Sequence, residues 1–226
     1  MTTLVTFSGI DGAGKSTQID WICEQLATRG CRVRRIAFWD DVAVMPTLRA
    51  GASFRFLNKN VQGKGTAQLR SDKNVQRWYL TVIRAVFYLF DSLSLRMLVS
   101  RERNKRPDYI VFDRYIYDQF VQIRARHWLA RAFMRLLLRI APAPDFPFIL
   151  DASPEAAFQR KPEYPLAFML EYRQAFLRLR TLVPRLIVVG PGSIGDISQV
   201  LVTCLLSDPT LPLQQKISTA IAAPTQ

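Results

Sequence analysis

Short hydrophobic runs alternate along the chain with longer stretches of helical periodicity. The runs cover residues 4–8, 32–38, 109–113, 146–151 and 186–190. Helical patterns occupy residues 15–29, 74–103, a region near 119–140, and residues 154–159, 166–181 and 194–206. Strands that are apolar almost throughout are typical of a parallel sheet with helices on both faces. The pattern therefore predicts an α/β fold with a parallel sheet of about five strands flanked by helices on both faces.

The length and composition suit a single folded domain. The chain has 226 residues, of which 49% are hydrophobic, and this is enough for one large core. We expect the domain to span residues 1–206. Residues 49–73 are polar and weakly periodic, which predicts a mobile connection or insertion. Residues 207–226 are rich in Ala, Thr, Gln and Pro, which predicts a loosely attached tail.

A glycine-rich loop joins the first predicted strand to the first predicted helix. Its sequence, Gly9-Ile10-Asp11-Gly12-Ala13-Gly14-Lys15-Ser16, fits the pattern G-x-x-x-x-G-K-[ST]. Such a loop wraps its backbone N–H groups around a phosphate, and the helix N-terminus adds partial positive charge. Lys15 is predicted to reach the β- and γ-phosphates, and Ser16 to supply a hydroxyl to Mg²⁺. The predicted ATP-binding residues are Gly9, Gly12, Ala13, Gly14, Lys15, Ser16 and Thr17; the alternative is a chance glycine turn before an ordinary helix.

A charged pair follows the predicted strand 109–113. Residues that lie just past the C-terminal ends of parallel strands line the ligand crevice of such sheets. Asp113 could therefore help to hold Mg²⁺ or its water, and Arg114 could meet a phosphate. The alternative is a strand terminus stabilised by an ion pair.

Taken together, these motifs resemble the thymidylate kinase family of nucleoside monophosphate kinases. Residues 7–18 look like the phosphate loop of that family, including Asp11 two positions past the first glycine. Asp113-Arg114-Tyr115 is similar to its Asp-Arg-Tyr/His signature, and residues 150–157 resemble the strand and turn before its lid. The resemblance extends over roughly residues 3–206, with the middle third poorly matched.

The resemblance implies ATP-dependent phosphoryl transfer to a nucleoside monophosphate, with dTMP as the leading acceptor and Mg²⁺ as the cofactor. The implied catalytic residues are Lys15, Arg114, Arg160 and Lys161, of which the last two belong to a lid near residues 157–165. The implied acceptor-binding residues are Asp11, Arg84, Phe87, Arg114 and Tyr115, and the implied metal ligands are Ser16 and Asp113. For Arg160 and Lys161 the alternative is a solvated helix end. The family also makes a homodimer plausible.

The middle of the chain departs from the family pattern. Residues 37–41 contain no arginine where the family carries an Arg-Glu-Pro-Gly-like segment. Phe87 is the candidate for stacking on the acceptor base, although an aromatic stripe on a long helix is more often core. The family places an arginine four positions later, and Asp91 stands there, where it would repel a phosphate. Arg84 or Arg96 might compensate, and Gln119 and Gln122 are substitutes for a glutamine of the family.

The excess of positive charge keeps other functions open. The formal net charge is +13, and 13 Lys or Arg residues lie between Arg49 and Arg106. Arg131, Arg135 and Arg139 recur every four residues beside apolar positions, so this stretch could meet nucleic acid, an anionic membrane or a partner, or pack into the core. A nucleotide-regulated binding module is thus the competing class of function, and a P-loop kinase for a different small acceptor is a further alternative.

The cysteines and the histidine add little chemistry. Cys23, Cys31 and Cys204 form no C-x-x-C pair, and the predicted location is the reducing cytoplasm, with no zinc site expected. The one histidine, His127, lies among arginines and is expected at the surface.

Overall fold

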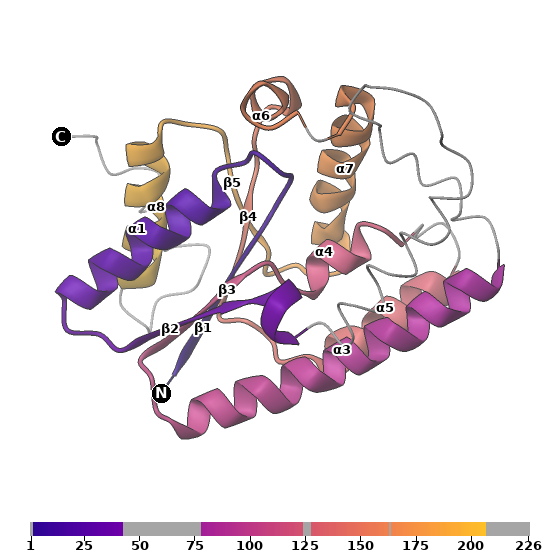
Figure 1. Ribbon diagram of the computed structural model, residues 1–226, viewed down its shortest axis with the longest axis horizontal. Helices are drawn as coiled ribbons and strands as arrows, with labels where there is room; N and C mark the ends of the chain where they lie inside the picture. Colours follow the sequence, from indigo (N-terminus) through magenta and orange to yellow (C-terminus); the bar gives the residue numbers. More distant parts are fainter. Residues whose placement is uncertain (1, 43–77, 124–127, 163, 207–226) are drawn as a thin grey trace, which may run out of the picture.

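A five-stranded parallel sheet forms the centre of the protein (Figure 1). The computed structural model describes residues 2–42, 78–123, 128–162 and 164–206, with residues 78–83 described by their backbone alone. The strands are β1 (Thr3–Ser8), β2 (Val33–Ala37), β3 (Tyr109–Asp113), β4 (Phe146–Leu150) and β5 (Ile187–Val189). Their order is β2-β3-β1-β4-β5, and every neighbouring pair is parallel. The predicted α/β class and the five strands are confirmed.

Helices cover both faces of the sheet (Figure 1). α1 (Lys15–Thr28) and α8 (Ile194–Leu206) pack together on one side. The other side carries α3 (Trp78–Asn104), α4 (Ile116–Phe120), α5 (Trp128–Ile140) and α7 (Leu166–Arg178), and α6 (Pro154–Arg160) lies near the C-terminal end of β4. Two short helical segments, η1 (Phe38–Val42) and η3 (Leu179–Thr181), complete the described elements.

The helical region predicted near residues 119–140 is divided in two. All five residues of α4 are buried, whereas α5 buries only Met134 and Leu137. α4 ends at Phe120, and residues 121–123 form a turn and a bend instead of continuing the helix. Residues 124–127 lie outside the described residues, and so do the predicted connection 49–73, the predicted tail 207–226 and the prediction for His127.

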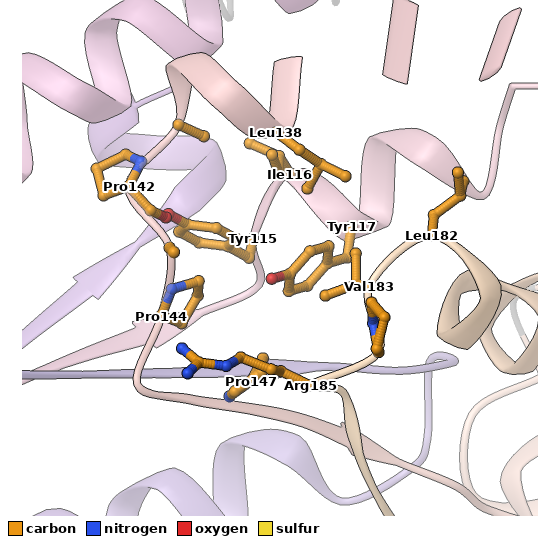
Figure 2. Close-up of a pocket in the computed structure, with 13 residues that line it drawn as sticks. Tyr115, Ile116, Tyr117, Leu138, Pro142, Pro144, Pro147, Leu182, Val183 and Arg185 are labelled. Carbon is orange, nitrogen blue, oxygen red and sulfur yellow. The ribbon is translucent and has the colours of Figure 1, made fainter. Parts of the chain in front are cut away.

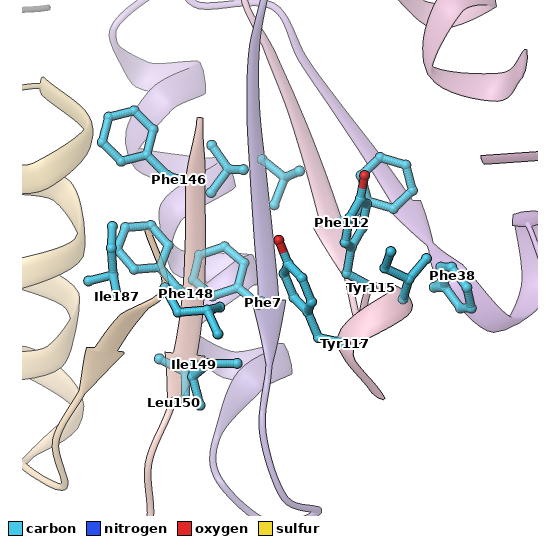
Figure 3. Packing of buried hydrophobic residues seen from close by; sticks show 14 of the residues in the cluster. Phe7, Phe38, Phe112, Tyr115, Tyr117, Phe146, Phe148, Ile149, Leu150 and Ile187 are labelled. Atoms are coloured by element: carbon cyan, nitrogen blue, oxygen red, sulfur yellow. The ribbon is translucent and has the colours of Figure 1, made fainter. Parts of the chain in front are cut away.

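Aromatic side chains form the layer that joins β1 to β4 (Figure 3). The ring of Phe148 stacks on Phe7 of β1 at a centroid distance of 5.3 Å and lies 6.1 Å from Phe146. All three side chains are buried. Large rings packed across neighbouring strands resist sliding of one strand past the other. The segments that follow β1 and β4 are therefore held at a constant separation.

Among the described residues, no helix has both the length and the low charge required to cross a bilayer.

Candidate active site

The glycine-rich loop follows the central strand and packs directly on backbone from β4 and α6. Gly9 has φ 143°, and a Cβ atom at this position would lie 2.5 Å from the carbonyl oxygen of Leu150. Gly12 has φ 81°, and a Cβ there would lie 2.5 Å from the carbonyl oxygen of Ala157. Backbone atoms cannot yield as a flexible side chain can, so only glycine fits at either position. The loop is thereby seated between the end of β4 and α6.

The side chain of Lys15 bonds back to the backbone at the start of the loop. Its side chain is buried and donates hydrogen bonds to the carbonyl oxygens of Gly9 at 2.9 Å and Ile10 at 2.8 Å. Burial, with a further contribution from the nearby charge of Arg114, lowers the pKa of Lys15 to about 8. By contrast, Ser16 and Thr17 are exposed at the start of α1. This region thus combines a buried cation, Lys15, with two exposed hydroxyls, those of Ser16 and Thr17.

Arg114 stands beside the loop because β3 is the neighbour of β1. Its backbone N–H donates to the carbonyl oxygen of Phe7 at 2.9 Å, and its φ of 69° turns the chain sharply away from the sheet. The guanidinium donates to Asp118 Oδ1 at 3.0 Å and to Asp11 Oδ1. Lys15 Nζ lies 3.9 Å from the same Asp11 oxygen. The structure therefore brings together three predicted site residues, Asp11, Lys15 and Arg114.

Opposing charges control the ionisation of this group. Burial alone would raise the pKa of Asp11, but Arg114 and Lys15 outweigh it and hold that pKa below its ordinary value. Burial alone would lower the pKa of Arg114, but Asp118 and Asp11 outweigh it and raise that pKa. Asp11 and Arg114 thus form a stable ion pair, and both side chains keep about a fifth of their surface exposed, 20% and 23% respectively.

Asp118 is a site residue that was not predicted. Its carboxylate is 1% exposed and accepts hydrogen bonds from Ser8 Oγ at 2.6 Å, from the backbone N–H of Tyr115 at 3.3 Å and from Arg114. Burial raises its pKa, although Arg114, Lys15 and the Ser8 hydroxyl oppose that change. An acidic residue four positions after Arg114, in a short segment that begins and ends with the apolar residues Ile116 and Phe120, is the signal that could have revealed it.

The two predicted lid cations also lie at the loop. Arg160 Nη1 donates to the carbonyl oxygen of Gly12 at 3.0 Å, although the arginine itself is exposed. Lys161 follows at the end of α6, and its charge is among those that lower the pKa of Asp11. Ser153 caps the N-terminus of α6 by accepting from the N–H of Ala156 at 3.3 Å. The short helix therefore presents its C-terminal cations to the phosphate loop.

The predicted magnesium ligands have suitable chemistry. Asp113 ends β3 and lies 3.6 Å from Arg35 Nη2, so the ion-paired alternative also applies to it. Ser16 offers a free surface hydroxyl. Mg²⁺ prefers hard oxygen donors and is usually held by one or two protein oxygens together with substrate phosphates. Ser16 and Asp113 fit that requirement, and the described residues contain no group of three or more His, Cys, Asp or Glu side chains able to hold a metal by themselves.

Tyr115 does not lie at the acceptor side of the site. Its side chain is completely buried, its ring packs edge-on against Phe112, and its hydroxyl donates to the carbonyl oxygen of Pro142. The sharp turn at Arg114 sends the next side chain into the core, and this corrects the prediction that Tyr115 binds the acceptor. Tyr172 of α7 is closer to the charged group: its hydroxyl donates to the backbone carbonyl of Asp118 at 3.4 Å.

Two of the predicted acceptor-binding residues belong to α3. Arg84 and Phe87 are both partly buried near the start of the described side chains of this helix. Asp91 is completely buried and accepts a hydrogen bond from Gln119 Nε2, so its carboxylate is directed inward. Gln122 accepts from the hydroxyl of Tyr88 at 3.2 Å. The carboxylate of Asp91 is therefore held inside the protein by Gln119.

Comparison with known proteins agrees with this fold. The chain is 26% identical over 186 residues to a protein of Archaeoglobus fulgidus described as a probable thymidylate kinase, covering 77% of this chain and 80% of that protein. The crystal structure of thymidylate kinase from Ehrlichia chaffeensis matches with a TM-score of 0.54 at 17% identity, covering 90% of this chain and 98% of that one. No protein-family model matches the chain.

The fold and the loop define the class: the protein has a P-loop nucleoside triphosphatase fold. The sequence similarity to a probable thymidylate kinase, at 26% identity, agrees with the resemblance noted in the motifs.

The lowered pKa of Lys15 predicts that ATP affinity depends on pH. A bound triphosphate favours the protonated lysine, so binding should be constant below about pH 8 and should weaken above it, by up to about tenfold per pH unit. Calorimetry in buffers of different ionisation enthalpy should also detect proton uptake above about pH 8. A Lys15→Gln variant should bind more weakly and lose this dependence; a flat profile in the unmodified protein would contradict the prediction.

Asp118→Asn is predicted to weaken the acceptor side of the site selectively. The amide keeps the size of the side chain but removes the negative charge and replaces one acceptor oxygen by an NH2 donor, so Arg114 on one oxygen and the backbone N–H of Tyr115 on the other cannot both stay bonded. We expect the acceptor KM to rise about tenfold while ATP affinity changes little. Asp108→Asn, the same charge change at the opposite end of β3, is the matched control. Unchanged KM in a folded variant would show that Asp118 does not position Arg114.

Proposed function

We propose that the protein transfers the γ-phosphoryl group of ATP to a nucleoside monophosphate, with dTMP as the leading acceptor. The observation that carries the proposal is the convergence of three elements on one loop: Lys15 within it, Arg114 from β3 beside it, and Arg160 from α6 above it. A simple nucleotide-binding switch has no need of the second and third cations. The similarity to thymidylate kinases supports the same assignment.

On the donor side, the loop would bind the triphosphate through its backbone N–H groups and the N-terminus of α1. Lys15 would leave the carbonyls of Gly9 and Ile10 and reach the β- and γ-phosphates. Phosphoryl transfer depends on positioning and on neutralising charge, so this cation stabilises the leaving group. Mg²⁺, for which Ser16 and Asp113 are the proposed ligands, would supply further neutralisation of the phosphate oxygens.

On the acceptor side, Arg114 would orient the attacking phosphate oxygen. Its ion pair with Asp11 is partly exposed and its ion pair with Asp118 is not, so an incoming phosphate can replace the first while the second stays intact. Asp11 would then be free to accept from the acceptor sugar. Arg160 and Lys161 would close over the transferring group and exclude water, with direct transfer and no covalent enzyme intermediate.

Two alternatives stay distinguishable from this proposal. A different small acceptor is favoured by the region of Asp91 and Gln119, which departs from the family pattern. A nucleotide-regulated module that binds nucleic acid or an anionic membrane is favoured by the exposed residues Arg131, Arg135 and Arg139 of α5. Such binding would weaken steeply with added salt.

The proposals on assembly and location rest on single features. A homodimer is supported by an exposed apolar stripe on α3, formed by Val86, Phe90, Leu93 and Met97. A reducing, cytoplasmic location is supported by the three cysteines, Cys23, Cys31 and Cys204, which are all free thiols.

A coupled ADP-release assay over a panel of nucleoside monophosphates tests the function. ATP turnover should rise when one monophosphate, with dTMP first in line and dUMP next, is added, and Lys15→Ala should abolish it. Stimulation by a different monophosphate would keep the kinase and change the acceptor. ATPase activity that no monophosphate alters, together with tight and salt-sensitive polyanion binding, would favour the binding module.

Arg160→Ala is predicted to lower kcat by about a hundredfold or more while ATP affinity stays nearly constant, because the guanidinium acts on charge that develops during transfer. Arg160→Lys should recover part of the loss. Arg178→Ala, which removes an exposed arginine of α7, serves as the control. Unchanged kcat would remove Arg160 from the mechanism.

A further inference from the structure

A cavity of about 220 Å³ lies between α4, the end of α5 and the segments that lead into β4 and β5 (Figure 2). Its lining is almost entirely apolar, and four of the residues are prolines, Pro142, Pro144, Pro147 and Pro184. Because each proline ring restricts its own backbone, these walls are preformed. A ligand that enters such a cavity orders few groups on binding, which favours affinity for a small molecule.

One polar group of the lining, the hydroxyl of a buried tyrosine, faces this apolar space. Tyr117 is 1% exposed, and its ring is fixed against Tyr115 at a centroid distance of 5.3 Å. Its hydroxyl is directed into the cavity and has no hydrogen-bond partner among the described residues (Figure 2). Burial raises the pKa of Tyr117, so the hydroxyl keeps its proton at neutral pH. The cavity therefore offers one hydrogen-bond donor that its walls do not satisfy.

A cation borders the same space. Arg185 lines the cavity from the segment before β5, and its side chain is exposed and forms no ion pair with any described residue (Figure 2). A guanidinium and a hydroxyl donor at the edge of an apolar space are complementary to a carboxylate attached to an apolar body. A neutral apolar molecule would leave the Tyr117 hydroxyl unsatisfied, at a cost in free energy.

We propose that this cavity is a binding site for a small aromatic carboxylate. Its ring lies between the prolines and the tyrosine rings, and its carboxylate accepts from Tyr117 and pairs with Arg185. The volume is sufficient for a single ring. The site shares α4 with the residues that hold Arg114 but none of the residues of the phosphate loop, so its occupancy is independent of the proposed phosphoryl transfer.

The test is direct binding of 4-fluorobenzoate to the full-length protein, followed by ¹⁹F NMR. We expect saturable binding that is weakened about fivefold by Tyr117→Phe and by a similar factor by Arg185→Gln, since each removes one interaction with the carboxylate. Ala143→Phe places a ring in the cavity from an exposed wall position and should abolish binding. The neutral analogue 4-fluorobenzyl alcohol should bind more weakly than the carboxylate.

Arg180→Gln is the matched control, because it removes an exposed arginine that does not line the cavity and should leave binding unchanged. Far-UV circular dichroism checks that each variant is folded. If Tyr117→Phe does not fold, Ala143→Phe and Arg185→Gln still test the proposal. The proposal is overturned if 4-fluorobenzoate shows no saturable binding, if ATP displaces it, or if folded Ala143→Phe binds it as the unmodified protein does.

Discussion

The close packing of the phosphate loop on backbone carbonyls is the constraint on which the site depends. Gly9 rests against Leu150 at the end of β4, and Gly12 rests against Ala157 of α6, each at a separation that no side chain could occupy. These contacts exist because β1 lies between β3 and β4 in a parallel sheet. The same placement puts Arg114 on one side of the loop and Arg160 on the other. One short loop is thereby contacted by Arg114, by the end of β4 and by α6, which are all distant from it in the sequence.

The charges at this point are balanced by carboxylates of unequal accessibility. Asp118 is buried and joins Ser8 of β1 to Arg114, the residue after β3, so it serves as a fixed partner. Asp11 is partly exposed and can exchange its partner for a ligand. Lys15, whose pKa is lowered by burial, is bonded to carbonyls that a phosphate would replace. The site thus keeps its cations in place with contacts that an anion can displace and with one contact that it cannot.

The donor and acceptor sides follow the thymidylate kinase pattern to different degrees. A phosphate presents the same shape and charge whatever nucleoside carries it, and the loop that would bind it matches the family pattern closely. A base is recognised by the particular groups around it, and here Asp91 and Gln119 bond to each other inside the protein where the family pattern expects an arginine nearby. This departure from the family pattern therefore lies in the region that we propose contacts the acceptor.

By itself, the sequence determined the class of fold, the strands to within about a residue at either end, and the phosphate loop, because each depends on neighbours in the chain: apolar runs, helical periodicity and glycines at set spacing. The pairing of Asp118, the burial of Tyr115 and the break between α4 and α5 were decided only by the tertiary structure. Each depends on what the sheet and the neighbouring helices leave room for. The left-handed backbone of Arg114 shows the difference most clearly: the motif predicted a charged group at the end of β3, but only packing decided that this arginine would face the loop while the tyrosine after it entered the core.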